Sequence, residues 1–106
     1  GRTVAQLRAR LAERPGMELA SSFYNLDAAE RAISEVMRAN VLRIERWATS
    51  NPKYKLTLTK KISADVGYGV LRGEANPIKL NNVKVVLKYE SYNGQPYYVL
   101  TSYLEK

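Results

Sequence analysis

The sequence lacks two residue types entirely, because none of its 106 residues is cysteine or histidine. Without cysteine the chain can form no disulfide, no thiolate zinc site and no thiol nucleophile. Without histidine it lacks the most frequent metal ligand and the most frequent general base near neutral pH. An enzyme that depends on histidine is therefore incomplete within these residues.

Long apolar runs are missing as well. No segment approaches the ~18 apolar residues of a membrane span, and no signal-peptide pattern is present. The acidic residues form no group with the character of a metal site. We therefore expect no metal ion, no other cofactor and no stable insertion into a membrane.

Basic residues, in contrast, are in excess. The chain has 17 Lys and Arg against 10 Asp and Glu, a net charge of +7. This charge favours an anionic partner, which could be nucleic acid, an anionic membrane or an acidic protein. The content of 45% hydrophobic and 25% charged residues is typical of a folded globular protein. The length predicts a single domain, residues 1–106, with one modest core.

The first half of the chain has the sequence pattern of two helices. A capping box at Thr3 begins a helix over about 4–13. A second capping box at Asp27 begins a longer helix over about 27–49, whose apolar stripe is interrupted at Asn40. The second half alternates polar and apolar residues and predicts strands within 54–104. The expected fold class is α+β, with two N-terminal helices packed on a twisted antiparallel sheet.

The last two strands form a predicted hairpin around Asn93-Gly94, a strong signal for a two-residue turn. Such a turn fixes the pairs Lys84–Tyr103, Val86–Thr101 and Lys88–Val99. Directly paired side chains share a face of the sheet. The predicted core face carries Val83, Val85, Leu87, Tyr89, Tyr98, Leu100 and Leu104. The opposite face carries Lys84, Val86, Lys88, Val99, Thr101 and Tyr103, which is either a solvated sheet surface or an anion site built from cations and hydroxyls.

Four segments of the sequence resemble a known family. They are Thr3–Leu11, the block Ser22–Ile33 with the sequence SFYNLDAAERAI, Gly69–Gly73, and Tyr98–Tyr103. Together they resemble the RNase A-like toxin domain at the C-terminus of bacterial contact-dependent growth inhibition proteins and related polymorphic toxins. The resemblance covers essentially the whole chain, and the block Ser22–Ile33 is its most specific part.

The resemblance implies a pancreatic-ribonuclease-like fold without disulfides and a metal-independent endoribonuclease activity. RNA would be cut by attack of its own 2′-OH, which leaves a 2′,3′-cyclic phosphate. It also implies delivery as part of a larger secreted, cell-surface effector that acts in the cytoplasm of a target cell. The implied partners are RNA and a cognate immunity protein. We expect no DNA substrate, and a monomer apart from the immunity complex.

The resemblance also implies site residues. The family's arginine in the first helix corresponds to Arg10, although helical periodicity alone does not distinguish it from Arg8. The family's C-terminal hydroxyl residues correspond to Thr101 and Tyr103. We expect Arg10 to stabilise phosphate charge, Thr101 to hydrogen-bond the substrate, and Tyr103 to position it or transfer a proton. Further candidates for binding the substrate are Lys84, Lys88, Arg72 and Lys60.

The family pattern begins His-Val-Gly-(Lys or Arg)-Thr, and Gly1-Arg2-Thr3 matches its last three positions. The histidine, as general base or acid, would lie two residues before Gly1. We therefore expect the chain as given to bind RNA but to be nearly inactive. Two alternatives remain open: a non-catalytic basic RNA-binding module, or a nuclease with another chemistry directed at tRNA or DNA. DNA cleavage is disfavoured because no acidic metal-binding cluster is visible.

Overall fold

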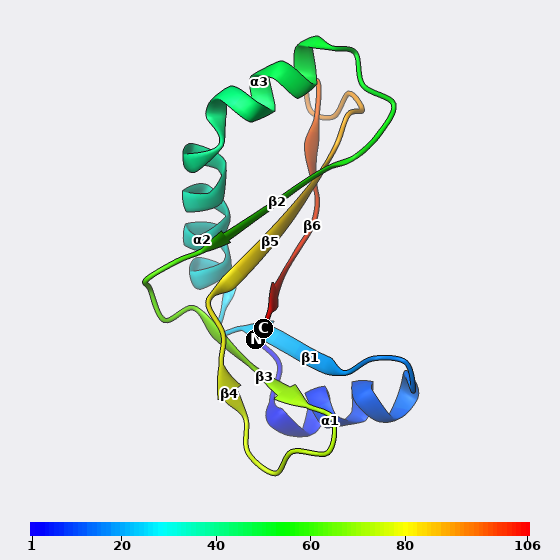
Figure 1. Cartoon of the computed structure of the whole chain (residues 1–106), viewed down its shortest axis with the longest axis vertical. Helices are drawn as coiled ribbons and strands as arrows, with labels where there is room; N and C mark the ends of the chain where they lie inside the picture. Colours follow the sequence, from blue (N-terminus) through cyan, green and yellow to red (C-terminus); the bar gives the residue numbers. More distant parts are fainter.

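Two three-stranded antiparallel sheets, one short and one long, form the framework of the chain (Figure 1). The computed structural model describes residues 1–106. The short sheet has the order β1 (Leu19–Phe23), β3 (Gly67–Leu71), β4 (Ile78–Lys79). The long sheet has the order β2 (Leu56–Lys61), β5 (Asn82–Lys88), β6 (Tyr98–Glu105). The molecule is elongated, with extents of 46 × 28 × 22 Å.

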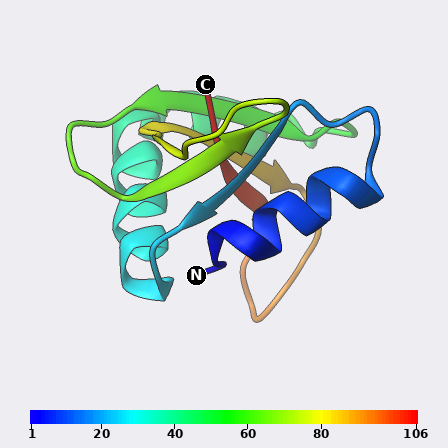
Figure 2. The ribbon, with the colours of Figure 1, turned by 90° about the horizontal axis from the view of Figure 1, so that it is seen from below.

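Each sheet has its own helical cover. Helices α2 (Leu26–Ala39) and α3 (Val41–Thr49) lie over one face of the long sheet, while α1 (Val4–Glu13) packs on the short sheet (Figures 1 and 2). Both chain termini lie in the middle of the molecule, near the place where β1 approaches the C-terminal end of β6 (Figure 1). No helix is long and apolar enough to cross a membrane.

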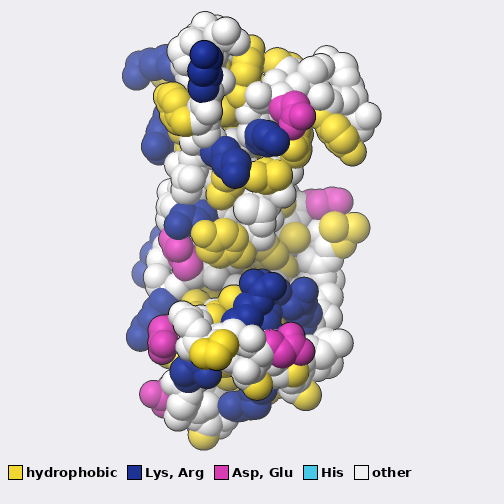
Figure 3. Space-filling model, turned by 90° about the vertical axis from the view of Figure 1, so that its right-hand side faces the viewer, with side chains coloured by type: hydrophobic (Ala, Val, Ile, Leu, Met, Phe, Trp, Pro, Cys, Tyr) yellow, Lys and Arg dark blue, Asp and Glu magenta, His cyan; other side chains and the backbone are white.

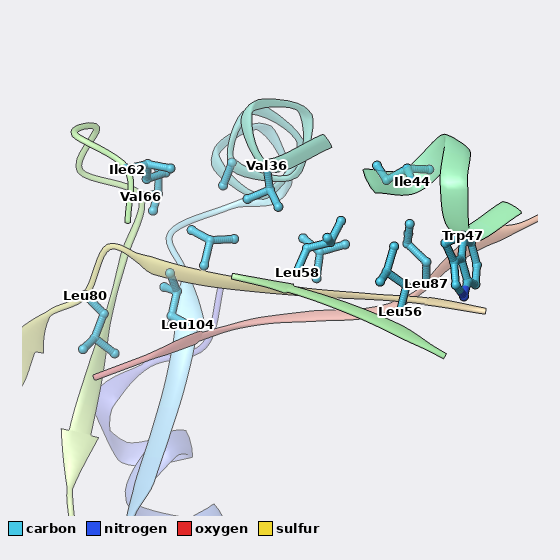
Figure 4. Close-up of a cluster of buried hydrophobic side chains, with 13 residues drawn as sticks. Val36, Ile44, Trp47, Leu56, Leu58, Ile62, Val66, Leu80, Leu87 and Leu104 are labelled. Carbon is cyan, nitrogen blue, oxygen red and sulfur yellow. The ribbon is translucent and has the colours of Figure 1, made fainter. Parts of the chain in front are cut away.

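The buried side chains form two clusters rather than the single core that the length predicts. The larger cluster lies between the long sheet and helices α2 and α3, and includes Val36, Leu58 and Trp47 (Figure 4). The smaller cluster joins α1 to the short sheet and consists of Leu7, Leu11, Ala20 and Val70. Burial of apolar side chains stabilises each helix-on-sheet layer separately.

Helix α1 spans the expected residues, and both of its ends are tied to hydrogen-bond partners. Thr3 and Gln6 form the predicted capping box, with each side chain bonded to the other residue's backbone N–H. At the other end, Arg72 of the loop after β3 donates to the carbonyl oxygens of Leu11, Arg14 and Met17 at 2.7–2.9 Å. Leu11 lies in the last turn of α1 and Arg14 and Met17 follow it, so one side chain ties the end of the helix and the loop after it to the loop after β3.

The prediction of one helix over 27–49 is wrong, because the helix breaks at Asn40 and continues as α3. The Asn40 side chain donates to the carbonyl of Val36 at 2.8 Å, and its backbone N–H bonds to Met37. An asparagine that competes for helical carbonyls in this way favours a break. The predicted capping box at Asp27 is also wrong, since Asn25 caps the helix by accepting from the N–H of Ala28.

The α+β class is confirmed, but the fold has three helices and two sheets in place of the expected two helices and one sheet. Strand β1 lies outside the expected strand region of 54–104 and was not predicted. It is short and only Ala20 in it is fully buried, so it has no clear alternating pattern. Its ladder with β3 pairs residues far apart in sequence, such as Ala20 with Val70, and only the tertiary fold supplies that partner.

The hairpin register is confirmed at Lys84–Tyr103 and Val86–Thr101, and Tyr92 bridges Gln95 at the turn. The predicted pair Lys88–Val99 is wrong. A bulge after the pair Val86–Thr101 leaves Leu100 without a partner, so Lys88 pairs with Tyr98 instead. Two residues expected in the core therefore lie elsewhere. Leu100 is 40% exposed, and Tyr98 shares the face of Lys88, while Tyr97 packs against the core.

The three hydrogen bonds of Arg72 predict a measurable effect on stability. Replacing it, Arg72→Ala, leaves three carbonyls, in the last turn of α1 and in the loop after it, without these charged donors. The variant should lose about 1–2 kcal/mol of unfolding free energy in urea titrations. Arg14→Ala removes the same charge from an exposed side chain that donates no hydrogen bond, and should be nearly neutral. Equal stability losses in the two variants would contradict this role of Arg72.

Candidate active site

A cleft of about 850 Å³ runs between β1 and the C-terminal half of β6. Its walls come from the start of the chain, α1, β1, the first turns of α2, and β6. Figure 3 views the side of the molecule on which β6 lies, where exposed hydrophobic side chains are flanked above and below by basic ones. The cleft thus lies where the two helix-covered sheets meet, and no helix covers it.

The three residues expected to be catalytic all line this one cleft. Arg10 enters it from α1, and Thr101 and Tyr103 enter it from β6. Alternation along β6 places Thr101 and Tyr103 on the same face, and the register of β5 and β6 keeps them there. Arg8 does not line the cleft, because its guanidinium donates to the carbonyls of Glu74 and Ala75 instead. Helical periodicity did not distinguish Arg8 from Arg10, and in the fold only Arg10 of the two lines the cleft.

The cleft depends on a close approach between the two sheets. The Ser21 hydroxyl of β1 donates to the carbonyl of Leu104 in β6 at 2.8 Å. Gly67 of β3 lies directly beneath this junction, and a Cβ there would collide with the Leu104 side chain and the Ser22 carbonyl. Glycine at position 67 therefore leaves room both for the backbone of β1 and for the Leu104 side chain of β6.

The first residues of the chain are fixed to the wall of the cleft. The backbone N–H of Arg2 donates to the Ser22 hydroxyl at 2.9 Å, and the Tyr68 hydroxyl donates to the Arg2 carbonyl. Gly1 leaves no room for a side chain, because a Cβ there would collide with the carbonyl of Tyr24. Hydrogen bonds on both sides of Arg2 thus orient the chain as it enters the cleft.

A network of aromatic and charged groups supports this wall from behind. The Tyr24 ring stacks on Tyr68 with 5.9 Å between ring centroids. The Tyr24 hydroxyl donates to Asp65 at 2.7 Å, and Lys79 lies 3.5 Å from the same carboxylate. The hydrogen bond from Tyr24 and the charge of Lys79 lower the pKa of Asp65, whereas the carboxylate raises the pKa of Tyr24.

Lys84 is the one of the four expected substrate-binding residues whose charge lies beside the expected catalytic residue Tyr103. Its Nζ lies 5.6 Å from the centre of the Tyr103 ring and 3.5 Å from the Glu105 carboxylate, which lines the cleft. The Tyr103 hydroxyl, followed by Glu105, raises the pKa of Lys84. The ammonium thus stays charged at neutral pH beside the cleft.

The other three expected substrate-binding residues lie outside the cleft. Lys60 pairs with Glu35 at 3.2 Å, Lys88 pairs with Glu90 at 3.1 Å, and Arg72 holds the end of α1. Their contact with substrate stays a prediction.

Several polar residues of the cleft were not singled out from the sequence. They are Arg2, Ser21, Ser22, Asn25, Ser102 and Glu105. Ser102 lies between two expected residues, and Ser22 begins the block that carries the resemblance. For both residues the sequence therefore contains a weak indication of a role in the site. Asn25 lies in the same block and Arg2 in the matched stretch Gly1–Thr3, whereas no feature of the sequence distinguished Ser21 and Glu105. No group of three or more acidic side chains is placed to hold a metal ion.

The lowered pKa of Asp65 predicts a pH dependence of stability. Because the folded-state pKa lies below the unfolded one, the stabilisation is present at neutral pH and is lost as the pH falls through the folded-state value. Asp65→Asn keeps an acceptor for Tyr24 but removes the charge. Urea unfolding at about pH 7 and about pH 3 should show a smaller stability difference in the variant. An undiminished difference would contradict this account of the network.

Comparison with known proteins places these features in a family. The profile of the family described as "Bacterial CdiA-CT RNAse A domain" matches residues 1–103. The fold is similar to the crystal structure of a CdiA-CT/CdiI complex from Y. kristensenii 33638, with a TM-score of 0.86 and 24% sequence identity over 100% of this chain and 93% of that one. A search of curated proteins gave no significant match. The resemblance seen in the sequence is thereby confirmed, and the chain belongs to the bacterial CdiA-CT RNAse A domain family of ribonuclease toxins of contact-dependent growth inhibition.

Proposed function

We propose that this domain is an endoribonuclease toxin that cuts RNA without a metal ion, by attack of the 2′-OH to give a 2′,3′-cyclic phosphate. The observation that carries the proposal is the convergence of Arg10, Thr101 and Tyr103 in one open cleft. RNA supplies its own nucleophile, so the protein needs only donors for the phosphate charge and groups that accept and donate protons.

The proposed roles follow from the chemistry of each side chain. The planar guanidinium of Arg10 can donate two parallel hydrogen bonds to a phosphate and offset the negative charge that develops on it. Thr101 and Tyr103 present hydroxyls from one face of a hydrogen-bonded strand, so their positions are fixed before the substrate binds. Lys84 adds a positive charge beside Tyr103 and offsets the carboxylate of Glu105.

Proton transfer is assigned to the histidine that the family pattern places two residues before Gly1. Two residues of extended chain span about 7 Å. Gly1 itself lines the cleft, and Ser22 and Tyr68 hold Arg2 against its wall. A histidine at that position would therefore reach into the cleft that Arg10 enters. This placement supports the assignment and gives it a direct test.

We further propose an immunity protein as the partner of this chain and a larger CdiA-type effector as its carrier into the cytoplasm of a target cell. The related structure is a complex of CdiA-CT with CdiI, which supports this partner. The net charge of +7 would attract an acidic inhibitor by long-range electrostatics. Apart from that complex, the proposed state is a monomer, and the proposed substrate is RNA rather than DNA.

The role of the histidine can be tested by adding it to the chain. The 106-residue chain should bind RNA and cleave it only slowly, whereas the same chain extended by His-Val at its N-terminus should cleave at least about 100-fold faster. Both reactions are run in EDTA on total RNA, and the products are analysed for 2′,3′-cyclic phosphate. A chain extended by Gln-Val is the matched control and should remain slow.

The outcomes of this experiment separate the candidate functions. Rapid cleavage by both extended chains would contradict the role of the histidine. Cleavage that requires added Mg²⁺ would contradict the metal-independent mechanism. RNA binding without cleavage by any of the chains would favour the non-catalytic RNA-binding module, which the lack of histidine in this sequence also fits.

Substitution of the two arginines of α1 tests whether Arg10 contacts the reacting phosphate. In the His-Val-extended chain, Arg10→Ala should lower kcat/KM by about 100-fold to 1,000-fold, since it removes a charged donor from the reacting phosphate. Arg8→Ala removes the same charge from the same helix but outside the cleft, and should leave kcat/KM nearly unchanged. Similar losses in both variants would indicate a general effect of positive charge rather than a specific contact.

A further inference from the structure

A second groove lies next to the hairpin turn, at the opposite end of β6 from the cleft. It has a volume of about 560 Å³ and is lined by Glu90, Ser91, Tyr92, Tyr98 and Val99. The rings of Tyr92 and Tyr98 lie 5.2 Å apart with a tilt of 42°, and Tyr92 is 58% exposed. The groove therefore offers an open aromatic surface next to a carboxylate.

The bulge at Leu100 places the groove and the cleft on the same face of the long sheet. Tyr98 pairs with Lys88, and Tyr103 of the cleft pairs with Lys84. Alternate residues of a strand share a face, so Lys88 and Lys84 lie on one side of β5, and their partners lie on that side of β6. Without the bulge, Tyr98 would face the core.

The spacing along β6 suits a continuous ligand. Tyr98 and Thr101 are separated by about 10 Å at the rise of a β-strand. β6 is also the edge strand of its sheet, so no further strand is paired with it along Tyr98–Thr101. A single strand of RNA with a phosphate near Thr101 can therefore continue along β6 and bring a neighbouring base to Tyr98.

The Glu90 carboxylate of the groove is held in a defined position. Its Oε2 accepts from the Tyr98 hydroxyl at 3.2 Å and lies 3.1 Å from the Nζ of Lys88. Lys88 and then Tyr98 lower the pKa of Glu90, so the group is ionised at neutral pH and can only accept hydrogen bonds. No hydrogen bond from this chain reaches Oε1, which is free for a ligand.

We propose that the groove is a second nucleotide-binding position, in which a base of single-stranded RNA stacks on Tyr92 and donates hydrogen bonds to Glu90. Guanine is the base that fits best, because its Watson–Crick edge carries two adjacent N–H donors. Uracil fits worst, because two carbonyl oxygens flank its single donor and would face the carboxylate. Stacking on tyrosine is a common way to hold unpaired bases. The proposal extends the ribonuclease function proposed above.

Binding of uncleavable RNA tests the proposal independently of catalysis. The probes are fluorescent 2′-O-methyl pentanucleotides, UUGUU and UUUUU, and anisotropy gives the Kd for each. The wild-type chain should bind UUGUU more tightly than UUUUU. Tyr92→Ala should weaken binding of UUGUU about tenfold. Glu90→Gln should remove most of the preference for guanine and leave the Kd for UUUUU nearly unchanged.

Two further variants control for damage to the hairpin. Tyr92→Phe keeps the ring and should bind like wild type, while thermal unfolding shows whether Tyr92→Ala loosens the fold. Tyr54→Ala removes a tyrosine that is 64% exposed but lines neither the groove nor the cleft, and should bind both probes like wild type. Equal Kd values for both probes in wild type, Tyr92→Ala and Glu90→Gln would overturn the proposal.

The proposed base position and the proposed activity can fail separately. If the His-Val-extended chain cleaves RNA but binding does not depend on Tyr92 and Glu90, only the base position is overturned. If binding depends on both residues but no RNA is cleaved, the base position stands and the ribonuclease function fails.

Discussion

The close passage of the two sheets at Gly67 is the constraint on which the rest of the structure depends. There a single methyl group on β3 would collide with the Ser22 carbonyl of the neighbouring strand β1 and with the end of the Leu104 side chain of β6. The hydrogen bond from Ser21 to Leu104 joins the sheets at the same place. Because each sheet has its own helices and its own buried cluster, this junction sets how the two halves are oriented. The cleft is the space that this orientation leaves between β1 and β6.

The junction also decides what lines the cleft. It brings α1, which packs on the short sheet, toward β6 of the long sheet, so Arg10 faces hydroxyls from the other end of the sequence. Next to the junction, Ser22 of β1 and Tyr68 of β3 hold the first residues of the chain on the short sheet. Arg10, Thr101 and Tyr103 all come from a helix or a hydrogen-bonded strand, so their positions are fixed before a ligand binds. The same β6 strand continues to the hairpin groove, so one sheet edge connects both proposed binding positions.

Much of the local structure could be predicted from the sequence. The capping box at Thr3 and the Asn93-Gly94 turn act through neighbouring residues, and both are present. The pairs Lys84–Tyr103 and Val86–Thr101 were counted from that turn and are present, although the pairs between them and the turn are shifted by one residue; two expected site residues were thus placed on one face before the fold was known. The break at Asn40 and the bulge at Leu100 could not be derived in this way. Both are single-residue irregularities, and the regular periodicity of a helix or a strand does not reveal them.

The sequence by itself determined the chemical repertoire: a basic chain without cysteine or histidine, with hydroxyls in its last strand, lysines in the strand before it, and an α+β order of elements. Only the tertiary structure decided which of these groups meet. It placed Arg10 rather than Arg8 in the cleft, used Arg72 to hold the end of α1, and turned Tyr98 outward beside Tyr92. The physical reason is that helix and strand periodicity, caps and turns reflect interactions between residues only a few positions apart in the sequence. The distances between α1, β1 and β6, in contrast, are set by non-local strand pairing and by the close approach at Gly67.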